Sequence, residues 1–259
     1  MLGALAGDII GSRFEWHNNR SKEFELFNDE SFFTDDSVLT VATAECLLTG
    51  EAYTVAYRLW GRRWPDAGYG TRFQGWLADP SRGPYNSCGN GAAMRVRTAG
   101  FAATTLEEAL QLAEASAVVT HNHPEGVKGA QATAAAIFLA RTGSGKEAIR
   151  RYCEETFRYR LDRTLDEIRP GYQFDETCQK TVPEALTAFF EATDFEDAIR
   201  GAISLGGDSD TLACITGGIA QAAFGIPGWI RQETEKRLHP DMVRVVRAFE
   251  ERYMDAPRA

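Results

Sequence analysis

Two short acidic motifs, far apart in the chain, contain the residue types best suited to chemistry. The first is Phe33-Thr34-Asp35-Asp36-Ser37, and the second is Gly206-Gly207-Asp208-Ser209-Asp210-Thr211. Carboxylate and hydroxyl oxygens are the ligands that Mg²⁺, Mn²⁺ and Ca²⁺ prefer, whereas zinc and copper favour the Cys and His that both motifs lack. The donor set therefore indicates a site for hard divalent cations.

Each motif by itself can also be interpreted as a helix N-cap. Asp, Ser and Thr are preferred there because their oxygens accept hydrogen bonds from free backbone N–H groups, and negative charge suits the positive end of the helix dipole. Capping needs one oxygen per helix, however, and the two motifs supply six donor residues: Thr34, Asp35, Asp36, Asp208, Asp210 and Thr211.

If the two motifs converge, their four carboxylates repel one another and raise one another's pKa values unless cations offset the charge. Two divalent cations, which lie roughly 3.5–4 Å apart in binuclear centres, would balance four negative charges and could activate a water. We therefore expect these six residues to bind two hard divalent cations, with Mg²⁺, Mn²⁺ and Ca²⁺ all open at this point.

Two glycine-rich segments and one histidine pair are further candidates for ligand binding. Glycines in residues 68–70 (Gly-Tyr-Gly) and 87–91 (Ser-Cys-Gly-Asn-Gly) would let a ligand approach the backbone closely, although plain turns between helices are an alternative. His121 and His123 could chelate zinc, yet no nearby Cys or acidic cluster completes four ligands. A loop histidine that hydrogen-bonds a substrate or the backbone is the better interpretation.

Helices are predicted to position these groups. Apolar residues recur at helical spacing, and alternating β-type runs are nearly absent, so we predict an all-α fold. The first motif opens a helix that ends near Leu48, before Gly50, and the second opens a helix that ends near Phe224. Gly217 and Gly218 lie within the second helix, where small residues permit close packing of another helix. The other predicted helices cover residues 106–113, 130–138, 182–190, 198–203 and 243–253.

The bulk properties of the chain are those of a globular protein. The 259 residues are 44% hydrophobic and 25% charged with no linker-like stretch, so we predict one domain spanning 1–259. A net charge of -9 argues against nucleic-acid binding. The N-terminus reads as a first helix rather than a signal peptide, and no run is apolar enough for a membrane span. Five widely spaced cysteines favour reduced thiols and a cytoplasmic protein, and a monomer is the default expectation, with the oligomeric state left open.

The order and combination of these motifs resemble the ADP-ribosylglycohydrolases, the group that includes the dinitrogenase reductase-activating glycohydrolase. The resemblance covers nearly the whole chain. It runs through residues 3–8 with Gly11 to Glu15, then 34–37, 68–70, 87–95, 120–121 and 204–211.

Membership of that family would imply an orthogonal multi-helix bundle with a binuclear Mg²⁺ centre held by the six residues above. It would also imply that Ser87, Cys88, Gly89, Asn90 and Gly91 hold the phosphates and ribose of ADP-ribose. By the same resemblance, His121 would reach the distal part of the ligand, and Glu15 would lie near the scissile bond as the catalytic residue.

Two positions depart from the family pattern. Ser37 replaces a threonine and keeps a hydroxyl, whereas Cys88 stands where some relatives carry an aromatic residue that stacks on adenine. Tyr172 could serve as the adenine platform instead, or it could be a half-buried packing residue, and the sequence leaves both open.

The resemblance implies a Mg²⁺-dependent hydrolase that cleaves the glycosidic bond between ADP-ribose and an acceptor. The acceptor stays open between a protein side chain, such as arginine or serine, and the acetyl group of O-acetyl-ADP-ribose. A non-catalytic ADP-ribose-binding or structural protein is the alternative, and it should show gaps among the ligands or at Glu15; all seven positions are filled. A phosphate-ester hydrolase would not require the loop at residues 87–91.

Overall fold

The structure, a computed structural model, describes residues 1–254, and most of these residues are helical. A short 3-10 helix, η1, covers Ser12–Phe14. The α-helices are α1 (Leu2–Gly11), α2 (Asp35–Thr49), α3 (Tyr53–Arg63), α4 (Thr71–Ala78), α5 (Gly91–Met94), α6 (Arg97–Ala102), α7 (Leu106–Ala117), α8 (Pro124–Arg141), α9 (Lys146–Phe157), α10 (Leu165–Ile168), α11 (Cys178–Glu191), α12 (Phe195–Ile203), α13 (Ser209–Phe224), α14 (Gly228–Arg237) and α15 (Pro240–Tyr253).

The predicted all-α fold class is confirmed. Within residues 1–254 the only β-type pairing is an isolated antiparallel bridge between Gly89 and Thr177. Every helix predicted from periodicity is present, as α1, α2, α7, α8, α11, α12, α13 and α15. None of the helices in this range is long and apolar enough to cross a membrane.

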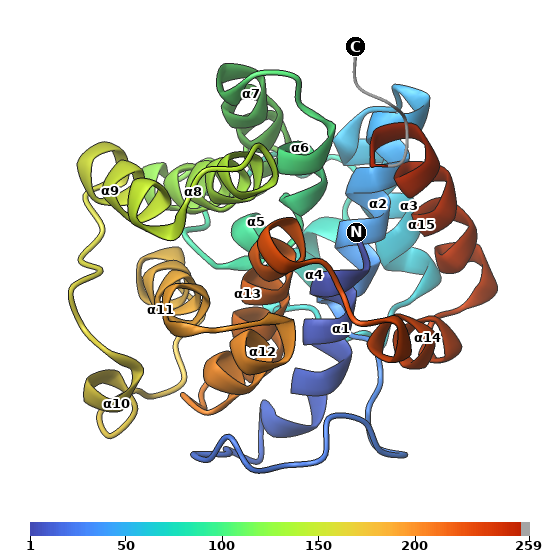
Figure 1. Cartoon of the computed structure of the whole chain (residues 1–259). Coiled ribbons are helices and arrows are strands. Elements are labelled where there is room, and N and C mark those ends of the chain that lie inside the picture. The colour runs from blue at the N-terminus through green and yellow to red at the C-terminus, as the bar shows by residue number, and fades with distance from the viewer. Residues whose placement is uncertain (255–259) are drawn as a thin grey trace.

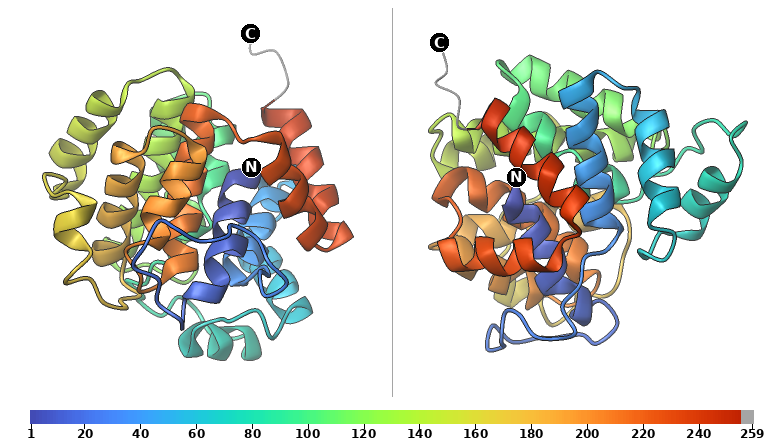
Figure 2. Two further views of the ribbon diagram at one scale, coloured as in Figure 1. Left: turned by 60° about the horizontal axis from the view of Figure 1, so that its bottom comes forward. Right: turned by 90° about the vertical axis from the view of Figure 1, so that its right-hand side faces the viewer.

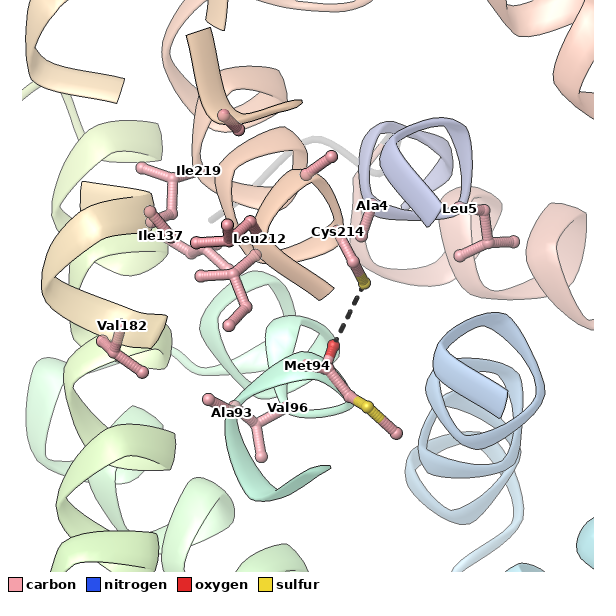
Figure 3. Packing of buried hydrophobic residues seen from close by; sticks show 14 of the residues in the cluster. Ala4, Leu5, Ala93, Met94, Val96, Ile137, Val182, Leu212, Cys214 and Ile219 are labelled. Atoms are coloured by element: carbon pink, nitrogen blue, oxygen red, sulfur yellow. Dashed lines mark hydrogen bonds between the residues drawn. The ribbon is translucent and has the colours of Figure 1, made fainter. Parts of the chain in front are cut away.

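The helix that follows the second acidic motif, α13, lies at the centre of the molecule with α1, α8, α11 and α12 around it (Figure 1). All its residues from Ser209 to Gln221 are buried. Figure 3 shows Leu212 and Ile219 of this helix among apolar side chains from α8 and α11, and the Cys214 thiol bonded to the Met94 carbonyl (3.6 Å). One hydrophobic core therefore surrounds the helix that carries the second motif.

The first helix packs against α13 at very short range along a line of glycines. Gly3, Gly7 and Gly11 are four residues apart and share one face of α1. A Cβ at Gly11 would lie 2.5 Å from the Asp210 Cα, and a Cβ at Gly7 would overlap the backbone carbonyl of Ala213. On the opposite helix, a Cβ at Gly217 would overlap the Gly3 carbonyl, which confirms the close packing predicted at this position.

Residues 15–34, after η1, contain no helix and cross one end of the bundle, as the blue segment in Figure 2 shows. Hydrogen bonds attach this segment to α12 and to the loop between α10 and α11. The Arg200 guanidinium donates to the carbonyls of Lys22 (2.8 Å) and Phe24 (2.7 Å), and the Arg20 guanidinium donates to the Tyr172 carbonyl (2.6 Å). The segment therefore returns the chain to the start of α2 along a defined path.

The glycine contact between α1 and α13 generates a stability prediction. Gly7→Ala should lower the free energy of unfolding by about 2–3 kcal/mol, because the added methyl group overlaps α13 backbone that cannot move aside. Gly228→Ala is the matched control, since this helical glycine has open space around its Cβ position and alanine should be neutral or stabilising. Urea unfolding of both variants checks this; equal stabilities would contradict the packing described here.

Candidate active site

Residues of both acidic motifs line one cavity of about 470 Å³. The sequence-predicted site residues that line it are Glu15, Asp35, Asp36, Ser87, Gly89, Asn90, Gly91, His121, Asp208, Asp210 and Thr211. Thr34, Cys88 and Tyr172 are not among the lining residues. The structure thus brings together most of the predicted residues, from segments at both ends of the chain.

The first motif is held in place by Asp8, a buried carboxylate of α1 to which the sequence analysis gave no role. Its oxygens accept hydrogen bonds from the Thr34 backbone N–H (3.0 Å) and hydroxyl (2.7 Å). They also accept from the backbone N–H of Ser37 (3.0 Å) and from its hydroxyl. An Asp in an otherwise apolar helix was the one sequence signal for this contact.

Thr34 is also the N-cap of α2, since its hydroxyl oxygen accepts from the Asp36 N–H (3.3 Å). The capping interpretation therefore holds for this residue. Asp208, by contrast, is the N-cap of α13 and makes no capping hydrogen bond with its side chain. Its Oδ2 instead accepts from the Asn90 amide (2.7 Å), which connects the second motif to the glycine loop.

The two motifs meet inside the cavity. The Thr211 hydroxyl donates to Asp36 Oδ2 at 3.2 Å, a direct contact between α13 and α2. Carboxylate oxygens of Glu15, Asp208 and Asp210 lie within 4.8 Å of one another. An acidic cluster that could hold a metal is therefore present.

Burial and repulsion by neighbouring carboxylates raise the pKa values of Glu15, Asp35, Asp36 and Asp210. Burial is the larger cause for Asp35, Asp36 and Asp210, and the neighbouring carboxylates add to it, so each pKa lies well above its usual range. Burial followed by the charges of Asp208 and Asp8 raises the pKa of Glu15 to about 7.

The donors fit a hard divalent cation. All of them are carboxylate or hydroxyl oxygens, the set that Mg²⁺ and Mn²⁺ prefer. Oδ1 of Asp36 is buried and has no hydrogen-bond partner among the described residues. A buried carboxylate oxygen without a partner costs free energy, which a bound cation would recover.

The glycine loop at residues 87–91 leads into α5 and forms the opposite wall of the cavity. The backbone N–H of Asn90 donates to the Glu176 carbonyl (2.7 Å), and its side chain donates to Thr181 (3.1 Å). A Cβ at Gly91 would lie 3.2 Å from Nε2 of His121, and one at Gly89 would lie 3.4 Å from it. The absence of a Cβ at Gly89 and Gly91 leaves room for His121 to face this loop.

The two histidines around residue 122 do not act as a pair. His123 is the N-cap of α8, with its Nδ1 accepting from the Glu125 N–H (3.1 Å). His121 bonds through its own Nδ1 to the Thr120 hydroxyl (2.7 Å). A hydrogen-bonding role for these loop histidines therefore fits better than a zinc site.

Tyr172 occupies a packing position. Its side chain is buried, its hydroxyl donates to the Lys180 carbonyl (3.3 Å), and a Cβ at Gly207 would lie 2.8 Å from its ring. Phe174, two residues on, lines the cavity and stacks on Trp16 with ring centroids 5.2 Å apart. No sequence pattern indicates this aromatic pair, because neither residue lies in a periodic element or a motif.

A family model described as ADP-ribosylglycohydrolase matches residues 1–257, so the chain belongs to this family. The resemblance drawn from the motifs is thereby confirmed.

Similar proteins carry related names. The chain is 28% identical to the ADP-ribosylhydrolase ARH3 of Mus musculus, over 87% of this chain and 83% of that protein. It is also 28% identical to the ADP-ribosylarginine hydrolase Tri1 of Pseudomonas putida, over 91% and 72%. A solved structure called an ADP-ribosylglycohydrolase-related protein complex superposes with a TM-score of 0.72 at 26% identity, over 98% of this chain and 96% of that one.

The raised pKa values generate a prediction for the cation-free protein. Groups whose pKa is higher in the folded than in the unfolded state hold more protons when folded, so stability falls as pH rises through the folded values. Between pH 5 and pH 8 in EDTA, the unfolding temperature should therefore fall by roughly 5 °C, and Mg²⁺ should reverse the fall. Calorimetry measures both effects.

Asp36→Asn is the comparison variant. It removes one buried charge, so its cation-free form should lose less stability over the same pH interval and should respond less to Mg²⁺. Identical pH profiles for the wild type and the variant would show that these carboxylates do not repel one another.

Proposed function

We propose that this protein is a Mg²⁺-dependent hydrolase that cleaves the glycosidic bond between ADP-ribose and an acceptor. The observation that carries the proposal is the convergence of Asp35, Asp36, Asp208 and Asp210 with Glu15 in a cavity that the glycine loop also lines. Family membership and the names of the relatives support the same reaction.

Thr34, Asp35 and Asp36 would hold the metal from α2, and Asp208, Asp210 and Thr211 would hold it from α13. We infer two Mg²⁺ ions, with Mn²⁺ able to replace them, because four acidic ligands need about four positive charges. Bound Mg²⁺ would supply positive charge that orients the hydroxyls of the distal ribose and activates water near them.

The residues of the chain itself would bind the ligand and move a proton. Residues 87–91 (Ser-Cys-Gly-Asn-Gly) would offer backbone groups to the phosphates and ribose of ADP-ribose, with His121 beside Gly89 and Gly91. In the cation-free protein the pKa of Glu15 is raised to about 7, first by burial, and Glu15 stays half-buried when cations bind to its neighbours. It can therefore donate a proton to the leaving group or accept one from the attacking water.

We also infer that the chain acts as one domain and as a cytoplasmic monomer with reduced thiols. The hydrophobic core includes residues from Met1 to Phe249 without a division. The five cysteines are free in the structure: Cys46, Cys88, Cys153, Cys178 and Cys214. Four of them are buried, which protects their thiols from solution oxidants.

The proposal is tested with a panel of defined substrates: ADP-ribosyl-arginine, ADP-ribosyl-serine and O-acetyl-ADP-ribose. Released ADP-ribose is measured with Mg²⁺ and with EDTA, and released phosphate is measured in parallel. At least one substrate should be cleaved with Mg²⁺ alone, and Asp210→Asn should lower that rate about a hundredfold or more while remaining folded. Undiminished hydrolysis in EDTA, or release of phosphate instead of ADP-ribose, would refute the proposal.

Replacement of Glu15 should separate binding from chemistry. Glu15→Gln keeps the size of the side chain but removes its proton transfer, so kcat on the cleaved substrate should fall about 10²–10⁴-fold. Binding of ADP-ribose, measured by calorimetry with Mg²⁺ present, should stay close to the wild-type value. A kcat near that of the wild type would remove Glu15 from the reaction.

A further inference from the structure

A fully buried arginine, Arg95, lines the cavity beside the glycine loop. It lies between α5 and α6, and its guanidinium carbon is 4.4 Å from the ring centroid of Tyr57. Among residues 1–254, no carboxylate lies within ion-pair distance of it. Burial of a cation without a counter-charge costs folding free energy. The hydrogen bonds that Arg95 makes therefore indicate what role it has.

Those hydrogen bonds all go to the segment that leads to His121. Nη2 of Arg95 donates to the Ser116 carbonyl (2.8 Å) and to the Thr120 hydroxyl oxygen (2.8 Å). The Thr120 hydroxyl is in turn 2.7 Å from Nδ1 of His121. Arg95, Thr120 and His121 thus form a continuous chain of hydrogen bonds that ends at the cavity.

The direction of this chain follows from what each group can do. A guanidinium only donates, so the Thr120 oxygen accepts from Arg95 and keeps its own proton to donate. Within the described part of the chain, the only other group bonded to this hydroxyl is Nδ1 of His121. If Nδ1 carried a proton, the buried hydroxyl proton would have no acceptor. Nδ1 therefore accepts, and the ring proton lies on Nε2.

The charge state of the ring agrees with this direction. Burial, and after it the charges of Arg95 and Arg72, hold the pKa of His121 well below its usual range, so the ring is neutral at neutral pH. Nε2 is on the side of the ring that faces Gly89 and Gly91, and His121 lines the cavity. No described protein group accepts a hydrogen bond from Nε2.

We propose that Arg95 and Thr120 are positioning residues that hold His121 as the neutral tautomer protonated on Nε2, so that this N–H donates to an acceptor oxygen of the ADP-ribosyl group. Only the choice of ligand rests on the proposed function; the tautomer follows from the protein alone. A neutral donor at this position binds a phosphate or ribose oxygen without adding a mobile proton to the site.

The tautomer is measured directly by long-range ¹H–¹⁵N correlation spectra of protein labelled at histidine. The chain has four histidines, and His121→Gln identifies the His121 signals by their loss. At neutral pH, His121 should show a protonated Nε2 and an unprotonated Nδ1. A protonated Nδ1, a charged ring or a rapidly exchanging mixture in the wild type would overturn the inference.

Variants at Thr120 test the chain of hydrogen bonds. Thr120→Val removes the hydroxyl at nearly constant shape and should abolish the single tautomer, whereas Thr120→Ser should preserve it. Thr133→Val is the matched control, because this buried threonine bonds only to the Gly129 carbonyl within α8 (3.0 Å). A wild-type His121 spectrum in Thr120→Val would overturn the inference, and the wild-type spectrum decides the matter even if this variant fails to fold.

The binding step is tested with ADP-ribose in the presence of Mg²⁺. Loss of one well-placed hydrogen bond should weaken binding about five- to tenfold in Thr120→Val and raise KM similarly, with kcat little changed and both constants restored in Thr120→Ser. Unchanged affinity in Thr120→Val would refute the donor role. If wild-type His121 has the predicted tautomer but the protein neither binds nor cleaves ADP-ribosyl compounds, only the proposed function is refuted. If the protein is an active hydrolase but His121 has the other tautomer, only this inference is refuted.

Discussion

The packing of α1 against α13 is the contact on which the rest of the site depends. On one face of α1, Gly7 and Gly11 allow its backbone to touch the backbone of α13 around Ala213 and Asp210. From another face, the carboxylate of Asp8 binds the first turn of α2 through four hydrogen bonds. One short helix therefore sets the distance between two acidic motifs that the chain otherwise separates widely. Because the first contact is to backbone and the second includes two backbone N–H groups, little adjustment is available to either motif.

The geometry concentrates negative charge in a buried place, which opposes folding unless protons or cations offset it. Raised pKa values at Asp35, Asp36 and Asp210 are the signature of this conflict, and such shifts are typical of functional sites. Neutral donors hold the cluster together: the Thr211 hydroxyl bonds to Asp36, and the Asn90 amide bonds to Asp208. The second bond also links the acidic end of the cavity to the glycine loop, so the two halves of the cavity have a common framework.

The opposite wall has the reverse electrostatic character. There the buried guanidinium of Arg95 and the neutral imidazole of His121 line the cavity beside the glycine loop. A ligand that carries anionic phosphates beside a polyhydroxyl sugar, as the proposed function requires, would meet complementary groups in both parts of the cavity. The aromatic pair of Trp16 and Phe174 lies at the same cavity on irregular segments, which tolerate sequence change more readily than helices do.

Local signals in the sequence predicted the longer amphipathic helices and the family, because helical periodicity and end signals such as Gly50 act over a few residues. They missed α3, α4, α5, α6, α9, α10 and α14, and the six metal ligands stay a prediction. They also predicted close packing at Gly217, since a glycine inside a helix has few other reasons to be there. The role of Asp8, the packing position of Tyr172, the place of Phe174 at the cavity, and the links from Arg95 to His121 were decided only by the tertiary structure. Each of these depends on side chains that meet across different elements, and no short stretch of sequence records which elements pack together.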